Sequence, residues 1–169
     1  MSASTRFMHP LARIAFNRAC EQAGLKPVIV QTMGTATASA GTHEIDGSYI
    51  AADGNKQSYC AAVDVSVNQK AVFLKTGAKV PMTDERIKWF LWKLAENGFV
   101  AWYRRKSQGF EAAHIHAIFV GVAMKPVLDA QVRDFLAGRD GLRGHRKEEF
   151  WTAPAALDAE LKKLFEAHN

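Results

Sequence analysis

The sequence predicts one α+β domain in which helices flank a central, mostly antiparallel sheet. Segments with helical periodicity and segments with strand periodicity alternate irregularly along the chain, which favours α+β over a regular series of βαβ units. The chain has 169 residues, the ordinary size of one domain, and 48% of them are hydrophobic. It contains no internal repeat, low-complexity tract or obvious linker. We therefore expect residues 1–169 to form a single domain.

The N-terminal part, residues 1–25, is expected to form an amphipathic helix from His9 to Ala23, with Gly24 as its stop signal. The apolar positions of this helix are Leu11, Ile14, Phe16 and Ala19. A short apolar strand is predicted from Pro27 to Met33. The segment from Gly34 to Asn55 has no period and is long for a connection inside a domain, which is typical of functional or disordered loops.

The middle of the chain holds the clearest helix signal. Tyr59 to Val67 is predicted to be a nearly continuous apolar strand. Thr83 to Asn97 has an N-capping threonine, acidic residues in its first turn and Gly98 after its last turn. The apolar stripe of this helix is Ile87, Phe90, Leu91 and Leu94. Strands are then expected at Phe99–Arg104 and Ala113–Val120.

The C-terminal part is predicted to be helical. One helix is expected from Pro126 to Leu136, and another from Ala155 to Ala167 within a tail of residues 138–169. Both cysteines, Cys20 and Cys60, are expected to be buried thiols rather than a disulfide.

The charge balance favours an anionic partner. Lys and Arg number 22 against 17 Asp and Glu, a net charge of +5, which suits an acidic wall polymer, a nucleic acid or a membrane surface without choosing among them. No stretch approaches the ~20 apolar residues of a membrane span, so a soluble protein is expected. Met1 to Leu25 carries no secretory signal, so we expect the protein to be cytoplasmic as synthesised.

The most distinctive motif is His114-Ile115-His116 in an apolar strand. Residues two apart on a strand project from the same face, so the two imidazoles are expected to lie side by side. Unpaired imidazoles on a buried face are unfavourable, and a divalent metal relieves this because histidine is its commonest ligand. Two hydrogen-bonded histidines of structural value are the alternative interpretation.

Three further residues are candidates for the same site. Asp64 interrupts an apolar strand, where a carboxylate must be paired or coordinated unless it lies at the wet end of the strand. His43 is a surface histidine or a third metal ligand, since catalytic zinc takes three protein ligands and leaves one position for water. Glu111 is either a general base or a solvated charge at the strand end.

Two segments carry a resemblance to a known family. The run from Leu94–Phe99 through Trp102-Tyr103 to Ala113–His116 resembles the hedgehog signalling domain and its peptidase relatives, the zinc D-Ala-D-Ala carboxypeptidases and murein endopeptidases. Ser58–Val65 is similar to the family segment that ends in a metal-binding aspartate. The resemblance covers roughly Thr42 to Gly121.

This resemblance implies an α+β fold of the hedgehog and DD-peptidase kind, with zinc held by a histidine, an aspartate and the second histidine of His-x-His. Asp64 and His116 take the last two places here, and His114 lies beside the metal as a catalytic or transition-state-stabilising residue. Gln57, a poor zinc ligand, stands seven residues before Asp64, where the family has its first histidine. We expect His43 to replace it, through an insertion that forms a β-hairpin.

The expected hairpin runs from Asp46 to Gln57 and turns at Asp53-Gly54. If this insertion is absent, the site has only two ligands and is inactive, and the chain is then a catalytically inert binding module on the same fold.

The resulting hypothesis is a zinc metallopeptidase that acts on peptidoglycan stem peptides or cross-links, as a D-Ala-D-Ala carboxypeptidase or an endopeptidase. Its expected metal ligands are His43, Asp64 and His116, and its expected catalytic residues are His114 and Glu111. In a different subgroup, with a glutamate three residues before its ligand histidine, His114 would be the ligand and Glu111 the base. Release in the manner of a phage lysin would bring such a protein to the cell wall.

An HUH-type enzyme that nicks single-stranded DNA is a further alternative, because it also carries His-x-His on a strand and a basic chain suits DNA. Such an enzyme needs a nucleophilic tyrosine close to the histidines. Tyr49, Tyr59 and Tyr103 all precede His116, two of them in expected strands. A nucleic-acid partner is therefore not expected.

Overall fold

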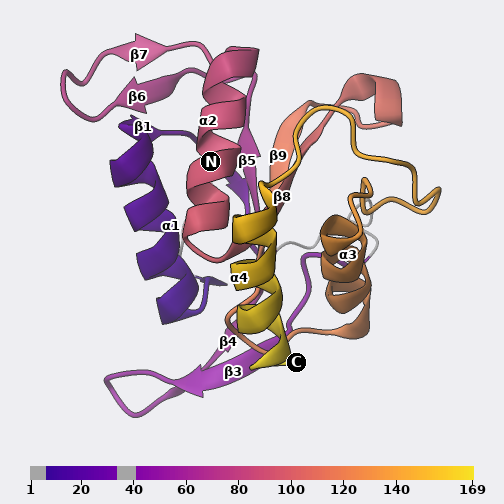
Figure 1. Cartoon of the computed structure of the whole chain (residues 1–169). Helices are drawn as coiled ribbons and strands as arrows, with labels where there is room; N and C mark the ends of the chain where they lie inside the picture. The colour runs from indigo at the N-terminus through magenta and orange to yellow at the C-terminus, as the bar shows by residue number, and fades with distance from the viewer. Residues whose placement is uncertain (1–6, 34–40) are drawn as a thin grey trace.

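The computed structural model describes residues 7–33 and 41–169, and these residues adopt the predicted α+β fold (Figure 1). Its centre is a four-stranded antiparallel sheet in the order β2-β5-β9-β8. The bounds of these strands are Ile29–Gln31, Ala62–Ser66, His114–Phe119 and Phe99–Arg104. The strands β5, β8 and β9 are far apart in the sequence and meet in one sheet, as predicted. Strand β5 is buried along its whole length.

The two faces of this sheet have different neighbours. Helices α1 (Pro10–Ala23) and α2 (Asp84–Glu96) lie side by side and pack on one face (Figure 1), where Phe99 of β8 contacts Phe16 of α1. Helix α3 (Pro126–Leu136) lies against the other face, where the Trp102 ring meets Phe135 at 5.4 Å between centroids. The second face carries the histidine motif.

The capping residue, the acidic first turn and the apolar stripe that predicted helix α2 are all present in the structure. The Thr83 hydroxyl accepts a hydrogen bond from the backbone N–H of Arg86, and Asp84 and Glu85 lie in the positively polarised first turn. The predicted stripe of Ile87, Phe90, Leu91 and Leu94 is buried. Each of these side chains contributes about 1.5–3 kcal/mol by leaving water.

Helix α1 begins one residue after the predicted start, and its predicted apolar stripe is confirmed at Phe16 and Ala19 but is wrong at Leu11 and Ile14. Leu11 and Ile14 are 52% and 56% exposed, whereas the sequence pattern placed them on the apolar stripe. The buried residues of α1 are Ala12, Phe16, Ala19 and Cys20. Helix α1 packs against α2, and the small Ala12 and Ala19 lie on its buried face together with Phe16.

Two predicted strands differ from those in the structure. Within the apolar run at Pro27–Met33 only Ile29–Gln31 forms a strand, β2. The residues just before this run form β1 (Leu25–Lys26), which belongs to another sheet with β6 (Ala71–Phe73) and β7 (Lys79–Val80). That small sheet was not predicted. Its strands of two or three residues are too short to show a period.

The predicted strand Tyr59–Val67 breaks at Cys60. Tyr59 ends β4 (Lys56–Tyr59), and the next two backbone N–H groups leave the ladder to donate to the Phe7 carbonyl and to Oδ2 of Asp46. The strand that carries Asp64 therefore starts only at Ala62. Contacts with residues distant in sequence cause the break, which explains why the local pattern does not reveal it.

The predicted hairpin is present. Strand β3 (Gly47–Ile50) pairs with β4 in antiparallel register, with Tyr49 opposite Gln57. The turn at Asp53-Gly54 places Gly54 at a φ of +80°, which a residue with a side chain rarely adopts. The Asp53 carboxylate accepts a hydrogen bond from the backbone N–H of Asn55 and closes the turn.

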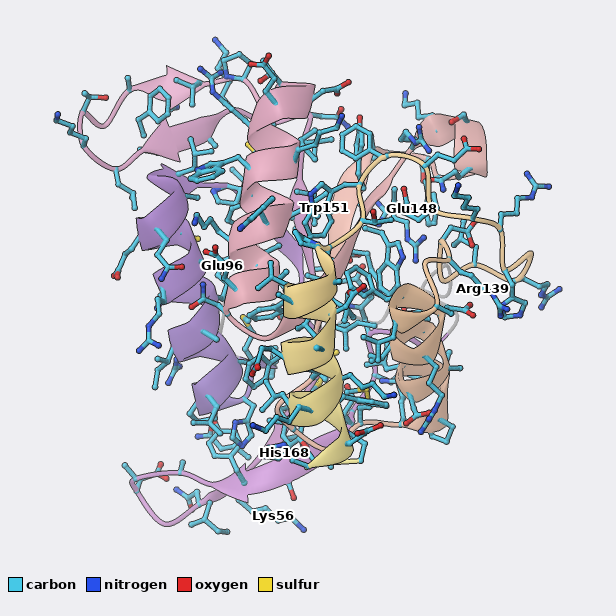
Figure 2. All side chains as sticks on the ribbon, in the orientation of Figure 1. Lys56, Glu96, Arg139, Glu148, Trp151 and His168 are labelled. Carbon is cyan, nitrogen blue, oxygen red and sulfur yellow. The ribbon has the colours of Figure 1, made fainter. Side chains whose placement is uncertain are left out.

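The C-terminal elements also match their predictions, with α4 at Ala155–Glu166. The segment from 137 to 154 passes β8 on its way from α3 to α4, and Figure 2 labels Arg139, Glu148 and Trp151 along it. Cys20 and Cys60 are free, buried thiols. Among the described residues, no helix combines the length and hydrophobicity needed to cross a membrane.

Asp46 anchors the base of the hairpin, and its removal should be strongly destabilising. Its side chain is fully buried, Oδ2 accepts from the Ala61 N–H, and Oδ1 accepts from the Lys125 N–H with the Lys125 ammonium 3.3 Å away. Asp46→Ala leaves these donors without a partner, so we expect the free energy of unfolding to fall by about 3 kcal/mol in urea titrations. Lys56→Ala, an exposed change on β4, is the control. Equal losses in both variants would contradict this role for Asp46.

Candidate metal centre

The candidate residues meet on the sheet face that lies against α3. In the pairing of β5 with β9, Asp64 lies opposite His116. In the pairing of β9 with β8, His116 lies opposite Trp102 and His114 lies opposite Arg104. Side chains directly across antiparallel strands share a face. These side chains therefore form one patch, and Asp64 lies on the central strand β5.

His43 completes a group of three potential ligands. It comes from the connection between β2 and β3, and its Nε2 lies 3.0 Å from Oδ2 of Asp64. On the other side, Nδ1 of His116 lies 2.8 Å from Oδ1 of the same carboxylate. Each residue offers one ligand atom, and these atoms all lie within 4.8 Å of one another. All three residues are buried, with His43 only 2% exposed.

The contact between His43 and Asp64 is short but is not aligned as a hydrogen bond. Within residues 7–33 and 41–169, Nε2 of His43 is a buried nitrogen without a hydrogen-bond partner, although Oδ2 of Asp64 is 3.0 Å away. Two side chains that bind the same metal ion lie this close without a hydrogen bond between them, because each directs a lone pair at the ion and not at the other side chain. The group can therefore hold a metal ion.

Hydrogen bonds on the outer side of each imidazole orient both rings. Nδ1 of His43 lies 2.7 Å from the Thr32 carbonyl oxygen, which can only accept, so Nδ1 carries a proton. Nε2 is therefore the nitrogen that would bind a metal, in place of the proton that the neighbouring Asp64 favours there. The Asp64 carboxylate can only accept, so Nδ1 of His116 donates to its Oδ1 at 2.8 Å, and this proton would have to leave for Nδ1 to bind a metal. Nε2 of His116 lies 3.1 Å from the amide oxygen of Gln131, to which it can donate when Nδ1 binds a metal. Metal-binding histidines nearly always donate their second N–H in this way.

Charge coupling within the group is strong. Burial by itself lowers the pKa of His43, but the Asp64 carboxylate outweighs burial and raises this pKa to about 10. Burial by itself raises the pKa of Asp64, and the His116 and His43 rings outweigh it and hold this pKa far below its usual value. Burial lowers the pKa of His116 against the attraction of Asp64. The three side chains thus form one charge-coupled group.

A cavity of about 540 Å³ opens onto the three residues. Its wall includes Arg104, Phe110, His114, Gln131 and Leu142. The indole of Trp102 stacks on His116, with ring centroids 6.1 Å apart and planes 23° apart, and its N–H donates to the Arg139 carbonyl. The arrangement leaves one side of the ligand group open to molecules in the cavity, as a catalytic metal site requires.

His114 lies beside the ligand group rather than within it. Its Nδ1 is 2.9 Å from the Ala112 carbonyl, which assigns the ring proton to Nδ1, and its Nε2 lies 3.7 Å from Oδ2 of Asp64. The side chain is 17% exposed. His114 can thus accept or donate a proton at Nε2 within the cavity.

Glu111 lines the same cavity as the ligand group, but it lies at the surface. It belongs to a bend before β9. Gln57 lies on β4, where its amide oxygen accepts from the Tyr49 hydroxyl at 3.1 Å. The hairpin thus separates Gln57 from the ligand group, and His43 occupies the position next to Asp64.

Several residues of the site were not predicted from the sequence. The outer partners Thr32 and Gln131 carry no signal, because one acts through its backbone and the other reaches the site from α3. Arg104 ends an apolar strand and looks like a solvated charge, yet it is 2% exposed. Its position two residues after Trp102 places it on the same face, which the strand pattern could have indicated. Comparison of the chain with family models, curated proteins and solved structures found no match.

The coupling of His43 to Asp64 predicts a pH dependence for the metal-free protein. The folded-state pKa of His43 is about 10, above the unfolded value of ~6.5, so its contribution to stability is complete below pH ~6.5 and is lost as pH rises through about 10. Relative to His43→Gln, the wild type should lose more than about 1.4 kcal/mol of unfolding free energy between pH 6.5 and 10, since this corresponds to one pKa unit. Urea titrations at several pH values measure the difference. A difference that stays constant over this range would show that the pair is not coupled.

Proposed function

We propose that the chain is a zinc-dependent peptidase that hydrolyses an amide bond in peptidoglycan stem peptides or cross-links. The observation that carries the proposal is the buried group of His43, Asp64 and His116 at the edge of a cavity. Two imidazoles and one carboxylate form a ligand set typical of hydrolytic zinc sites, and their outer hydrogen bonds fit that use. Zinc held there supplies Lewis-acid polarisation of a carbonyl and acidifies water at its open position.

The order of elements supports a relation to the hedgehog-like zinc peptidases. The helix, strand and His-x-His motif that resemble this family correspond to α2, β8 and β9, and Asp64 lies on the neighbouring strand β5. The hairpin β3–β4 accounts for the altered spacing of the first histidine. On this basis we infer the hedgehog and DD-peptidase architecture, and a peptidoglycan substrate also suits the net charge of +5.

His114 is the proposed catalytic residue. Its Nδ1 proton is held by the Ala112 carbonyl, so Nε2 is free to take a proton from the attacking water and return it to the leaving amine. Once protonated, the ring also stabilises negative charge that develops on the carbonyl oxygen. Glu111, exposed at the rim of the cavity, is the second candidate for the proton transfer.

The positions of the tyrosines weigh against the DNA-nicking alternative. None of the three lines the cavity at the histidines. Tyr103 lies opposite Ile115 and so projects from the other face of the sheet. The Tyr59 hydroxyl donates to the Ala123 carbonyl, and the Tyr49 hydroxyl donates to Gln57.

Metal content and hydrolysis, measured on the same preparations, test the proposal. The wild type should retain about one zinc per chain and release peptide fragments from purified peptidoglycan, followed by mass spectrometry. His43→Ala and His116→Ala should lose both zinc and hydrolysis. His114→Ala should keep zinc and lower kcat by about 10²–10⁴-fold, as expected for loss of a general base.

Gln57→Ala is the matched control, because Gln57 stands at the family's usual spacing but lies in the hairpin; it should keep both zinc and activity. A His114→Ala protein without zinc, beside a His116→Ala protein that retains it, would reverse the two roles. A folded, zinc-loaded wild type that releases nothing from peptidoglycan would support the inert binding module instead.

A further inference from the structure

A second cavity, of about 750 Å³, lies between the 3₁₀ turn Lys106–Gln108 and the segment 140–149 that follows α3. It adjoins the cavity at the metal centre, because Leu142 lines both. The lining of the second cavity includes neither His43 nor His116. A ligand bound there would therefore occupy a site of its own.

Glu148 is a buried carboxylate in the wall of the second cavity and is only 7% exposed. Its Oε1 accepts a hydrogen bond from the backbone N–H of Phe150 at 2.7 Å. Its Oε2 is buried and has no hydrogen-bond partner within residues 7–33 and 41–169. A buried carboxylate oxygen without a donor is costly in free energy. A cationic donor that enters the cavity would remove this cost.

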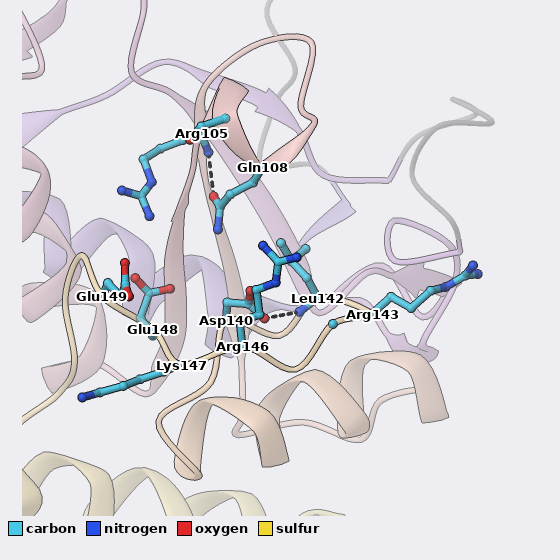
Figure 3. A pocket seen from close by; sticks show the side chains of 11 residues that line it. Arg105, Gln108, Asp140, Leu142, Arg143, Arg146, Lys147, Glu148 and Glu149 are labelled. Carbon is cyan, nitrogen blue, oxygen red and sulfur yellow. Dashed lines mark hydrogen bonds between the residues drawn. The ribbon is translucent and has the colours of Figure 1, made fainter.

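Arg105 carries the opposite charge in the same wall. It is half-buried, and its Nε is also buried without a hydrogen-bond partner in the part of the chain that the structure describes. Figure 3 shows its side chain extending toward the side of the cavity where Glu148 lies. The ion pairs of the segment 139–149 join Asp134 to Arg139 and His145, and none of those among the described residues joins Arg105 to Glu148.

The charges buried around the second cavity balance in sign. Asp140 is a second buried carboxylate in its wall, and the guanidinium of Arg104 donates to the Asp140 backbone carbonyl. Burial lowers the pKa of Arg104 to about 10, and the carboxylates of Asp140, Glu148 and Asp64 oppose this lowering. Apart from Asp64, which belongs to the metal centre, two carboxylates thus face two guanidinium groups. A ligand with a net charge would disturb this balance, whereas a ligand with one charge of each sign would keep it.

We propose that the second cavity binds a zwitterion with an ammonium and a carboxylate group on one carbon atom, as in a free amino acid. The ammonium donates to Oε2 of Glu148, and the carboxylate accepts from the guanidinium of Arg105. Both contacts are charge-assisted hydrogen bonds, which are roughly twice as strong as those between neutral groups. Binding there requires neither a metal nor the hydrolysis proposed above.

The exposed charges at the rim have less influence on the ligand. Arg143, Arg146 and Lys147 are exposed, so water and salt screen them. They attract polyanions, but a polyanion in the cavity would meet the buried carboxylates of its wall. Figure 3 shows Arg143 directed away from Arg105 and Glu148. Arg143→Met therefore removes a charge from the rim without removing either proposed contact.

NMR titration of the metal-free protein at pH 7 with three small probes tests the proposal. Glycine carries both charges, glycinamide carries only the ammonium group and N-acetylglycine carries only the carboxylate. Glycine should bind at least about tenfold more tightly than either analogue, since each analogue loses one charged hydrogen bond. The shifted amide signals should belong to residues 105–108 and 140–149, and not to His114–His116.

Three variants assign the two contacts. Glu148→Gln keeps the acceptor for the Phe150 N–H but removes the negative charge, and Arg105→Met removes the guanidinium. Each should weaken glycine binding at least about tenfold, whereas Arg143→Met should change it less than about twofold. Amide spectra verify the fold of each variant before titration.

The probes also distinguish the alternatives. Glycinamide that binds as tightly as glycine would show a cation site, and N-acetylglycine that binds as tightly would show an anion site. Either result would overturn the proposal. Glycine binding that survives Glu148→Gln and Arg105→Met, or the absence of any shift at the cavity, would also overturn it.

Discussion

The burial of the Asp64 carboxylate in the central sheet is the constraint on which the rest of the site depends. Strand β5 is covered on both faces and Asp64 is only 8% exposed, so most of its charge must be matched by its neighbours. His116 meets one carboxylate oxygen across the strand pairing, and His43 meets the other from a loop. Removal of either ring would leave a buried charge only partly compensated.

His43 reaches Asp64 because the rest of the molecule holds its loop in place. The Thr32 carbonyl fixes the ring, and Asp46 ties the hairpin base to Ala61 before β5 and to Lys125 before α3. The same sheet face receives Gln131 from α3 and the Asp140 carbonyl from the segment after α3. The geometry of the ligand group thus depends on tertiary packing from both halves of the chain.

Local patterns in the sequence were sufficient to predict the helices and the strand that carries the histidine motif. The periodicity of α2 and the continuous apolar run around His116 reflect burial directly, so the bounds of both elements could be predicted. The break at Cys60 and the outward face of Leu11 could not be predicted, because they depend on hydrogen bonds and helix contacts between distant segments. The proximity of His43 to Asp64 was expected because a zinc site needs a third protein ligand. The burial of Arg104 becomes evident only from the register of the strands.

The most direct test of this account is the position of zinc in crystals of the metal-loaded protein, located by anomalous scattering at the zinc edge. The account predicts one peak about 2.0–2.2 Å from Nε2 of His43, a carboxylate oxygen of Asp64 and Nδ1 of His116, with its remaining side open to the cavity. A peak bound by His114 instead of His116, or one that excludes His43, would contradict it.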